Sequence, residues 1–257
     1  MFGIILAAGK GTRMKSILSK VLHKVNDIPM ILITVRKLLE MEYMEKILIV
    51  VGDNRDKIDR LMAENLSSAE YTKLVFILQK EQLGTGHAVM VCKDYLARFP
   101  AEHSLILFAD LPLIEPATLN AMSQEGRGHG CLLAICHSEN PAGCGRIILE
   151  DNIITGSVEE KDCSDEQKLI KLINAGIYTI HNQLIIKYID DIKNNNAQKE
   201  YYLPDILHIL IANDHPITPY YIENTTEILN VNTPEQLAAA AAAAASAAAI
   251  SGGGCCD

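Results

Sequence analysis

The sequence lacks the marks of several large protein classes. No apolar run in its 257 residues approaches the roughly 20 residues of a membrane-spanning helix, so we expect no membrane partner. The first apolar run has no basic segment before it and is too short for a signal peptide. Positive charge is not in excess either. The formal net charge is −9, which argues against general nucleic-acid binding.

The cysteines lack any spacing typical of a zinc site, and their number is odd. Cys92, Cys131 and Cys136 lie in apolar runs, which predicts buried free thiols. Such thiols are typical of a reducing, intracellular setting, so we expect a cytoplasmic protein. The seven cysteines are Cys92, Cys131, Cys136, Cys144, Cys163, Cys255 and Cys256.

Composition and periodicity predict a doubly wound α/β fold. With 49% hydrophobic and 21% charged residues, the chain is typical of one large α/β domain, or of one domain with a small lobe. Short apolar runs alternate with helical patterns, and the early runs are apolar on both faces, as in a helix-covered parallel sheet. We predict strands at 3–6, 46–51, 73–78, 104–108, 131–136 and 175–180. We predict helices around 30–41, 56–65, 86–98, 116–124, 182–193 and 202–212.

Two segments depart from this alternation. Between 143 and 176 polar and charged residues accumulate, which indicates either a solvated insertion or a lid or second lobe over a ligand cleft. Near the C-terminus, Thr233, Pro234 and Gln236 predict the capped start of a last helix. The alanines that follow favour helix, although they also fit a placeholder for unknown sequence, and 251–257 is typical of a flexible end.

The segment LAAGKGTRM at 6–14 directly follows the first expected strand. Gly9 and Gly11 allow a tight turn with outward backbone N–H groups, while Arg13 and Lys20 add positive charge. Donors and cations at the carboxyl end of a first strand suit a polyphosphate. The segment is not a Walker A loop, and Met14 stands where the dinucleotide fingerprint has its third glycine. An ordinary strand-to-helix turn is the alternative.

The segment QKEQLGTGH at 79–87 follows the third expected strand. Gly84 allows close backbone approach to a flat or charged ligand. Gln79 and Gln82 offer paired donors and acceptors that suit the edge of a nucleobase. A capped helix start is the alternative reading of this segment.

Asp110 ends the fourth expected strand, and Pro112 soon follows it. A carboxylate at a strand end suits Mg²⁺ when phosphates supply the remaining oxygen ligands. The alternative is an aspartate that caps a helix or stabilises a turn.

Together these segments resemble the uridyltransferase domain of N-acetylglucosamine-1-phosphate uridyltransferase, a sugar-nucleotide pyrophosphorylase. The resemblance covers about 4–232, with LAAGKGTRM similar to the family's signature loop and QLGTGHA at 82–88 similar to its second signature. Further short matches follow in family order: GCGR at 143–146, VE at 158–159, KD at 161–162, DEQ at 165–167, NAG at 174–176, NNNAQ at 194–198, EYY at 200–202, Asp205, and VN at 231–232.

The resemblance implies a Rossmann-like nucleotidyltransferase fold, with a mostly parallel mixed sheet covered by helices on both faces and a small sugar-binding lobe. It implies a nucleotidyltransferase domain at 1–232, followed at 233–257 by an Ala-rich helix and a flexible Gly/Cys tail. The implied enzyme is a UDP-N-acetylglucosamine diphosphorylase, which makes UDP-N-acetylglucosamine and pyrophosphate from UTP and N-acetylglucosamine 1-phosphate with Mg²⁺.

Site residues are carried over from the resemblance position by position. It implies that Arg13 and Lys20 clasp phosphates as catalytic residues, and that Asp110 and Asn232 bind Mg²⁺. Gly145, Glu159 and Asn174 would hold the sugar phosphate. The implied nucleotide-binding residues are Leu6, Ala7, Ala8, Gly9, Gly11, Gln79, Gly84 and Thr85, of which Gln79 and Gly84 would read uracil.

Four positions depart from the resembled family. Ser19 stands where a proline is usual, Cys144 replaces a tyrosine, Glu160 replaces a histidine and Ala175 replaces a threonine. The last three lie on the sugar side, so they could enlarge or repolarise the sugar pocket. Bifunctional members also continue into a hexapeptide-repeat acetyltransferase domain. No such repeat is present, so we expect no acetyl transfer and no use of acetyl-CoA.

Other functions fit the sequence less well. Another sugar 1-phosphate or a cytidylyl acceptor is one alternative, against which the segments at 82–87 and 174–176 argue. A catalytically inactive nucleotide sensor is another, but Arg13, Lys20, Asp110 and Asn232 are all intact. A structural acidic protein would leave the glycine-containing segments unexplained.

Overall fold

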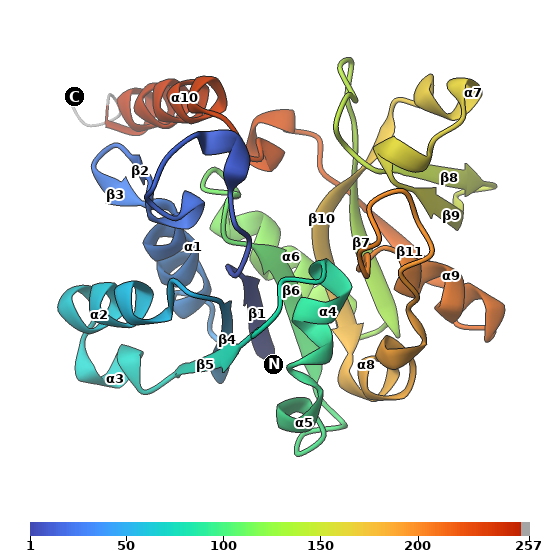
Figure 1. Cartoon of the computed structure of the whole chain (residues 1–257), viewed down its shortest axis with the longest axis horizontal. Coiled ribbons are helices and arrows are strands. Elements are labelled where there is room, and N and C mark those ends of the chain that lie inside the picture. Colours follow the sequence, from blue (N-terminus) through green and yellow to red (C-terminus); the bar gives the residue numbers. More distant parts are fainter. Residues whose placement is uncertain (253–257) are drawn as a thin grey trace, which may run out of the picture.

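A mixed nine-stranded sheet forms the centre of the computed structural model, which describes residues 1–252 and only the backbone at 248–252 (Figure 1). Its main path runs β11-β7-β10-β6-β1-β4-β5. The strands on this path share one direction except β10, which is antiparallel to β6 and β7. They are β1 (Phe2–Leu6), β4 (Lys46–Val51), β5 (Leu74–Leu78), β6 (His103–Phe108), β7 (Cys131–His137), β10 (Leu172–His181) and β11 (Ile217–Tyr221).

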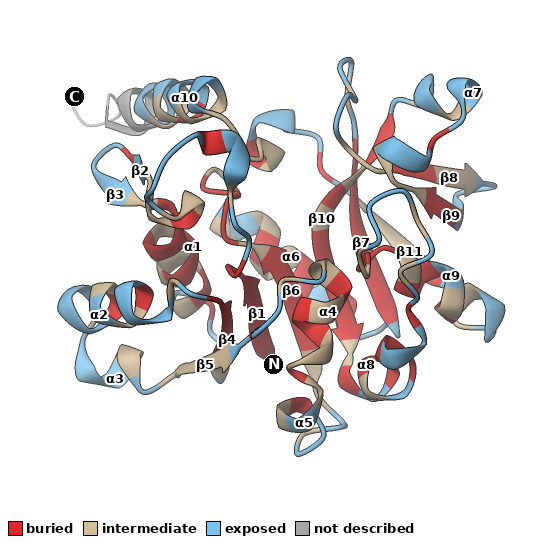
Figure 2. Cartoon of the chain, in the orientation of Figure 1, coloured by how far each residue is buried: buried red, intermediate tan, exposed pale blue. Residues whose placement is uncertain are grey.

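Helices cover both faces of this sheet, and the buried residues follow the sheet in Figure 2. Strand β1 is buried on both sides, so its residues alternate between two hydrophobic cores. Ile4 packs with residues of the helices on one face and Ile5 with those on the other. The first face carries α4 (Thr85–Met90), α8 (Asn182–Tyr188) and α9 (Asp205–Ala212); the second carries α1 (Met30–Leu39), α2 (Arg55–Asn65) and α6 (Pro116–Gly126). The α/β fold expected from the sequence is confirmed.

Several helix boundaries differ from the expected ones. The helix expected at 86–98 is interrupted between α4 and α5 (Lys93–Leu96), and the backbone N–H of Cys92 donates to the Val89 carbonyl three residues back, at 2.9 Å. The helix expected at 202–212 begins only at Asp205, because Pro204 occupies its N-cap. The helix expected at 182–193 ends at Tyr188 and gives way to a single 3-10 turn.

The polar stretch 143–176 forms a small lobe at the edge of the molecule (Figure 1). It contains the hairpin of β8 (Arg146–Glu150) and β9 (Ile153–Val158), the short α7 (Asp165–Lys168) and the start of β10. Asp151 and Asn152 both have positive φ, as a two-residue turn of type I′ requires. Strand β8 pairs with β10, so the lobe extends the main sheet. The second-lobe alternative therefore describes this stretch better than a featureless insertion.

The alanine-rich segment forms α10 (Pro234–Gly252), which lies beside the two-stranded sheet of β2 (Lys24–Val25) and β3 (Ile28–Pro29) (Figure 1). The expected cap is present: the Gln236 N–H donates to Thr233 Oγ1, and the Thr233 N–H donates to Gln236 Oε1 at 3.1 Å. Ala240 is buried with Val25 and Met30. The division at 232/233 stays a prediction, and the expected flexible tail lies outside the described residues from 253 on.

The expectation about the cysteines is confirmed as far as the described residues reach. Cys92, Cys131 and Cys136 are buried and free. Burial raises the pKa of the Cys92 thiol to about 12, which keeps it protonated and unreactive. Cys255 and Cys256 lie beyond the described residues. The remaining short helix, α3 (Ser68–Tyr71), carries a capping box and was not expected from the sequence.

Candidate active site

The first glycine segment continues from the end of β1, where Leu6 and Ala8 are buried and Gly9 is exposed. The Ala7 N–H donates to the Val50 carbonyl at 2.9 Å, which extends the pairing of β1 with β4. Gly11 has φ of 61°, and a Cβ there would lie 2.6 Å from Lys20 Cβ. Glycine at 11 therefore lets the segment pass directly against Lys20.

Four residues that are far apart in the sequence form a cluster, which we call the phosphate cluster: Arg13, Lys20, Asp110 and Asn232. The Lys20 ammonium donates to Asp110 Oδ2 and, at 2.9 Å, to Asn232 Oδ1. The Arg13 guanidinium donates to the same Asn232 oxygen at 2.9 Å. The structure thus brings together all four residues expected for phosphate and metal, at the ends of β1 and β6.

The carboxylate of this cluster has one unused oxygen. Asp110 is 4% exposed, and its Oδ1 has no hydrogen-bond partner among the described residues. Its Oδ2 and the Asn232 Oδ1 both face a cation, the Lys20 ammonium. The described residues contain no group of three or more His, Cys, Asp or Glu that could hold a metal. One carboxylate and one amide oxygen suit Mg²⁺ only if a substrate supplies further oxygens.

The second glycine segment is held by Tyr201, which lies on a distant part of the chain. Gly84 has φ of 118°, and a Cβ there would lie 2.5 Å from the Tyr201 carbonyl oxygen. The Tyr201 N–H donates to the Leu83 carbonyl at 2.8 Å, and the Gly86 N–H donates to the Tyr201 carbonyl at 2.7 Å. The Thr85 hydroxyl accepts from the Leu203 N–H at 2.9 Å. Gly84 therefore permits a backbone approach that a side chain would block.

Gln79 is nearly fully buried beneath this segment, at 3% exposure. Its amide nitrogen donates to the Gly84 carbonyl at 3.1 Å and lies 3.0 Å from His87 Nδ1. Gln82 donates to the Gln79 carbonyl at 3.1 Å and would touch a Cβ at Gly52. In this structure Gln79 supports the segment, and its expected role in reading uracil stays a prediction.

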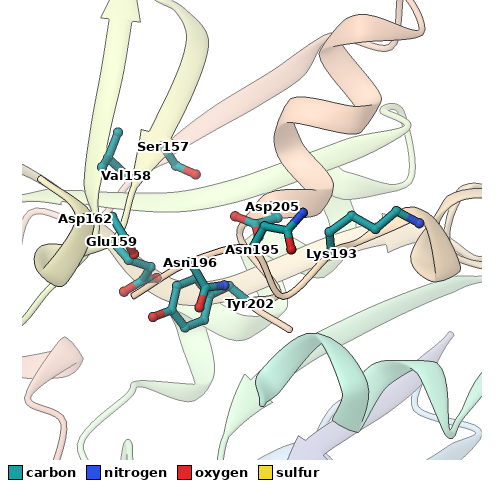
Figure 3. Close-up of a pocket in the computed structure, with 9 residues that line it drawn as sticks. All are labelled: Ser157, Val158, Glu159, Asp162, Lys193, Asn195, Asn196, Tyr202 and Asp205. Atoms are coloured by element: carbon teal, nitrogen blue, oxygen red, sulfur yellow. The ribbon is translucent and has the colours of Figure 1, made fainter. Parts of the chain in front are cut away.

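A pocket of about 310 Å³ lies under the small lobe (Figure 3), and we call it the acidic pocket. Glu159 and Asp162 come from the turn after β9, and Asp205 starts α9. The residues that line the pocket are Ser157, Val158, Glu159, Asp162, Lys193, Asn195, Asn196, Tyr202 and Asp205. The three residues expected on the sugar side lie in or beside it. A Cβ at Gly145 would lie 3.2 Å from Glu159 Oε1, and the Asn174 N–H donates to the Gly145 carbonyl at 3.0 Å.

The carboxyl groups of this pocket lie in surroundings that disfavour their ionised form. Burial, with the nearby carboxylates of Asp205 and Asp162, raises the pKa of Glu159 to about 7. Burial likewise raises the pKa of Asp205 above its ordinary value, and Asp162 adds to the shift. The buried hydroxyl of Tyr202 has no hydrogen-bond partner among the described residues, and burial raises its pKa to about 12. A ligand that donates hydrogen bonds would satisfy these groups.

Most of the lining residues had no role expected from the sequence. Asp162, Asn195, Asn196, Tyr202 and Asp205 stood among the short matches in family order, which was the signal that pointed to them. Lys193 was predicted only as a helix end. Lys193, Asn195, Asn196 and Tyr202 lie on the irregular segment between Asp191 and α9, whereas Asp162 follows β9 and Asp205 starts α9.

The four departures from the resembled family lie outside the lining of the acidic pocket. Glu160 forms an ion pair with the buried Arg146, with 2.6 Å between their charged atoms, so its charge is balanced. The Cys144 carbonyl also accepts a hydrogen bond from Arg146, and Ala175 is buried in the core on the α1 side. Ser19 accepts a hydrogen bond from the Asn54 side chain at 2.9 Å.

Comparison with known proteins places the chain in one family. Residues 3–149, more than half of the chain, match the model of the MobA-like NTP transferase domain. The bifunctional protein GlmU of Alkaliphilus metalliredigens is 41% identical over 241 residues, which cover 91% of this chain and 50% of that protein. The chain spans about half the length of the GlmU relatives. A probable UDP-N-acetylglucosamine pyrophosphorylase of Acanthamoeba polyphaga mimivirus is 37% identical, with 91% of this chain and 92% of that protein covered.

Solved structures show the same fold at lower identity. A putative glucose-1-phosphate thymidylyltransferase from Bacillus anthracis superposes with a TM-score of 0.78 at 20% identity, covering 95% of each chain. A UDP-glucose pyrophosphorylase complexed with UDP-glucose gives a TM-score of 0.75, also at 20% identity, over 95% of this chain and 98% of that one. Among the described residues, no helix is both long and apolar enough to cross a membrane.

Proposed function

The chain belongs to the nucleotidyltransferase family of the MobA-like NTP transferase domain, and from that premise we propose that it transfers a uridylyl group from UTP to N-acetylglucosamine 1-phosphate. The observation that carries the proposal is the phosphate cluster, where two cations, one carboxylate and one amide oxygen meet at the ends of β1 and β6. The similarity to the mimivirus protein, a probable UDP-N-acetylglucosamine pyrophosphorylase, supports the choice of substrates.

The proposed reaction needs no covalent intermediate with the protein. An oxygen of the sugar phosphate attacks the α-phosphorus of UTP, and the bond from that phosphorus to the bridging oxygen of the departing pyrophosphate breaks. Two anions must meet, and negative charge grows on the leaving group. Lys20 and Arg13, which converge on one Asn232 oxygen, offset this charge from fixed positions. Orientation of the two substrates lowers such a barrier by about 7–11 kcal/mol when it is well arranged.

Asp110 and Asn232 are the residues that would hold Mg²⁺. The fit rests on the buried Oδ1 of Asp110, which has no partner among the described residues, and on the two oxygens that already face a cation. When bound, Mg²⁺ would neutralise triphosphate charge. The protein's own part is to hold the Asp110 carboxylate in place beside the phosphates, and the hydrogen bond from Lys20 contributes to this.

The acidic pocket is the proposed site for the sugar. Glu159 and Asp205 offer acceptors for sugar hydroxyls. The Asn174 amide donates to the Tyr178 hydroxyl at 2.7 Å, and its carbonyl oxygen accepts from the Gly176 N–H at 2.8 Å. One amide hydrogen and one lone pair of Asn174 therefore stay available for an acetamido group.

Pyrophosphate release measured across a panel of substrates tests this proposal. UTP, CTP, dTTP and GTP are each paired with N-acetylglucosamine 1-phosphate, glucose 1-phosphate and galactose 1-phosphate, in the presence and absence of MgCl₂. We expect UTP with N-acetylglucosamine 1-phosphate to give the highest kcat/KM, with glucose 1-phosphate roughly 10- to 100-fold lower, because each missing partner leaves a buried polar group unpaired. Equal efficiency for the two sugars would overturn the sugar assignment, and no release from any pair would overturn the activity.

A further inference from the structure

Asn54 stands at a helix start but does not cap the helix. It occupies the N-cap of α2, where an asparagine side chain ordinarily accepts a hydrogen bond from the first turn. In this structure its side chain makes no capping bond and turns toward the sheet instead. The Asn54 side chain is therefore used for something other than the stability of α2.

The Asn54 carboxamide joins three segments at the end of the sheet. Its oxygen accepts from the Gly52 N–H at 3.0 Å, just after β4. Its nitrogen donates to the Ala7 carbonyl at 3.0 Å, just after β1, and to Ser19 Oγ at 2.9 Å. Both amide hydrogens are thus used, so the geometry is specific to a carboxamide.

Ser19 is the immediate neighbour of Lys20, and the segment before it has little other support. Lys15 has φ of 50°, and Ile17 and Leu18 are exposed. Among the residues that the structure describes, the Ser16 hydroxyl bonds only within this segment, where it accepts from the Leu18 N–H at 3.1 Å. The Asn54–Ser19 hydrogen bond anchors the end of the segment to the turn between β4 and α2, directly before the proposed catalytic lysine.

We propose that Asn54 and Ser19 act as a clip that positions Lys20 for the phosphate cluster. Lys20 must hold its ammonium within hydrogen-bond distance of Asp110 and Asn232, and small errors in such a position reduce the rate strongly. The clip fixes the backbone at the residue before Lys20 by a side-chain hydrogen bond. The contribution to the rate rests on the proposed function, whereas the contribution to the order of the segment does not.

The backbone at Ser19 suggests what the clip replaces. Ser19 has φ of −55° and ψ of 137°, a conformation that proline adopts without strain. Proline is the usual residue at this position in the resembled family, and its ring restricts φ covalently. In this chain the hydrogen bond from Asn54 holds the Ser19 side chain and so limits movement at this position. A proline at 19 should therefore make Asn54 dispensable.

A set of variants in the full chain tests the clip: S19A, N54A, S19A/N54A, S19P and S19P/N54A, with S16A as the matched control. S16A removes a serine hydroxyl from the same segment but leaves the clip intact. For each variant we measure the melting temperature, hydrogen exchange at 12–20 in the free protein, and kcat and KM for UTP. Hydrogen exchange reports the order of the segment whether or not the chain is a uridyltransferase.

We expect S19A and N54A to speed exchange at 12–20 and to lower kcat roughly 3- to 10-fold, the range that one hydrogen bond gives, with KM for UTP nearly unchanged. The double variant should lose less than the product of the two single losses. S19P should restore kcat and slow exchange in the N54A background. S16A should keep the wild-type kcat, with faster exchange confined to Leu18, whose N–H loses its acceptor.

Unchanged exchange at 12–20 in folded S19A would overturn the clip, and so would independent losses in the double variant. Loss of kcat in S19P/N54A equal to that of N54A would overturn the equivalence with proline. If the wild type releases no pyrophosphate, the proposed function fails, while the exchange measurements still decide whether the clip orders the segment.

Discussion

The phosphate cluster and the acidic pocket are built on different parts of the fold and differ in the charge that they present. The cluster stands at the carboxyl ends of parallel strands and uses fixed cations, as an anionic ligand requires. The pocket stands on the β8–β9 hairpin and an irregular segment, and it gathers carboxylates that repel one another. Under the proposed function, the charged ligand would therefore be bound by the most regular part of the sheet, and the sugar hydroxyls by the lobe at its edge.

Removal of the Asp110 carboxylate should lower activity more than any of the substitutions described below, because it disrupts the phosphate cluster while leaving the fold intact. We expect D110A to lower kcat/KM by roughly 1,000-fold or more, because Lys20 loses a partner and the proposed metal loses its only charged ligand. Pyrophosphate release is measured, with circular dichroism to confirm the fold. D94A, an exposed aspartate on α5, is the control. Near-normal turnover of D110A, or turnover in excess chelator, would contradict the assignment.

Loss of the Lys20 ammonium should cause the second-largest loss of activity. We expect K20A to lower kcat by about 100-fold while KM for UTP rises only a few-fold, because the charge that Lys20 offsets grows during the reaction. Steady-state kinetics separate the two constants, and K24A removes an exposed lysine nearby as the control. A pure rise in KM with unchanged kcat would show that Lys20 binds UTP without assisting the transfer.

A methyl group at Gly84 should damage the contact between the second glycine segment and Tyr201. The Cβ of G84A would lie 2.5 Å from the Tyr201 carbonyl oxygen, on a backbone with φ of 118°, so the segment must shift. We expect a lower melting temperature and a roughly 10-fold loss of kcat/KM. In the control G128A, the nearest atom to the new Cβ is 3.5 Å away, and that variant should keep its activity. Equal behaviour of the two variants would exclude a structural role for the Gly84 contact.

The smallest effect should come from E159Q and should appear as a change in pH dependence. Glu159 ionises near pH 7, so its carboxylate becomes a better acceptor and the wild-type KM for the sugar phosphate should fall a few-fold between pH 6 and 8. In E159Q, the pH dependence of KM that comes from Glu159 should disappear. Only the pH dependence due to the substrate phosphate, which also ionises near pH 6, should remain. Identical pH profiles for KM would place Glu159 outside the sugar site.

The free energy of unfolding should also depend on the ionisation of Glu159, and it should fall as the pH rises. The folded-state pKa of Glu159 lies above its ordinary value of 4.5, so the wild type loses stability as pH rises from about 4.5 to about 7. E159Q avoids this loss and should exceed the wild type by roughly 1–3 kcal/mol at pH 8, with the difference vanishing near pH 4.5. Denaturant unfolding at the two pH values measures it.

Part of the phosphate cluster was predictable from sequence because parallel strands buried on both faces read as apolar runs, whereas Asn232 was expected only from the family resemblance. The ends of β1 and β6 follow from those runs, and with them the positions of the first glycine segment and Asp110. Strands β8, β9 and β11 were missed for identifiable reasons. Strand β9 is exposed at alternate positions in a polar stretch, and β11 contains Pro219, which an edge strand tolerates.

The acidic pocket was less predictable because strand direction and loop paths are not encoded locally. Asn174 lies at the start of β10, and it reaches the same edge of the sheet as Asp110 only because β10 runs antiparallel to β6. An apolar run carries no information about its direction. Tyr202 and Asp205 reach the pocket through tertiary contacts that no short-range pattern specifies.

The backbone hydrogen bonds between Tyr201 and the second glycine segment have a thermodynamic consequence. They join a segment proposed to contact the nucleotide with the residue adjacent to Tyr202 of the acidic pocket. A ligand that orders one side reduces the entropy that the second ligand must remove. We therefore expect positive cooperativity between the two substrates. By linkage, the factor by which UTP tightens the binding of the sugar phosphate equals the factor by which the sugar phosphate tightens the binding of UTP.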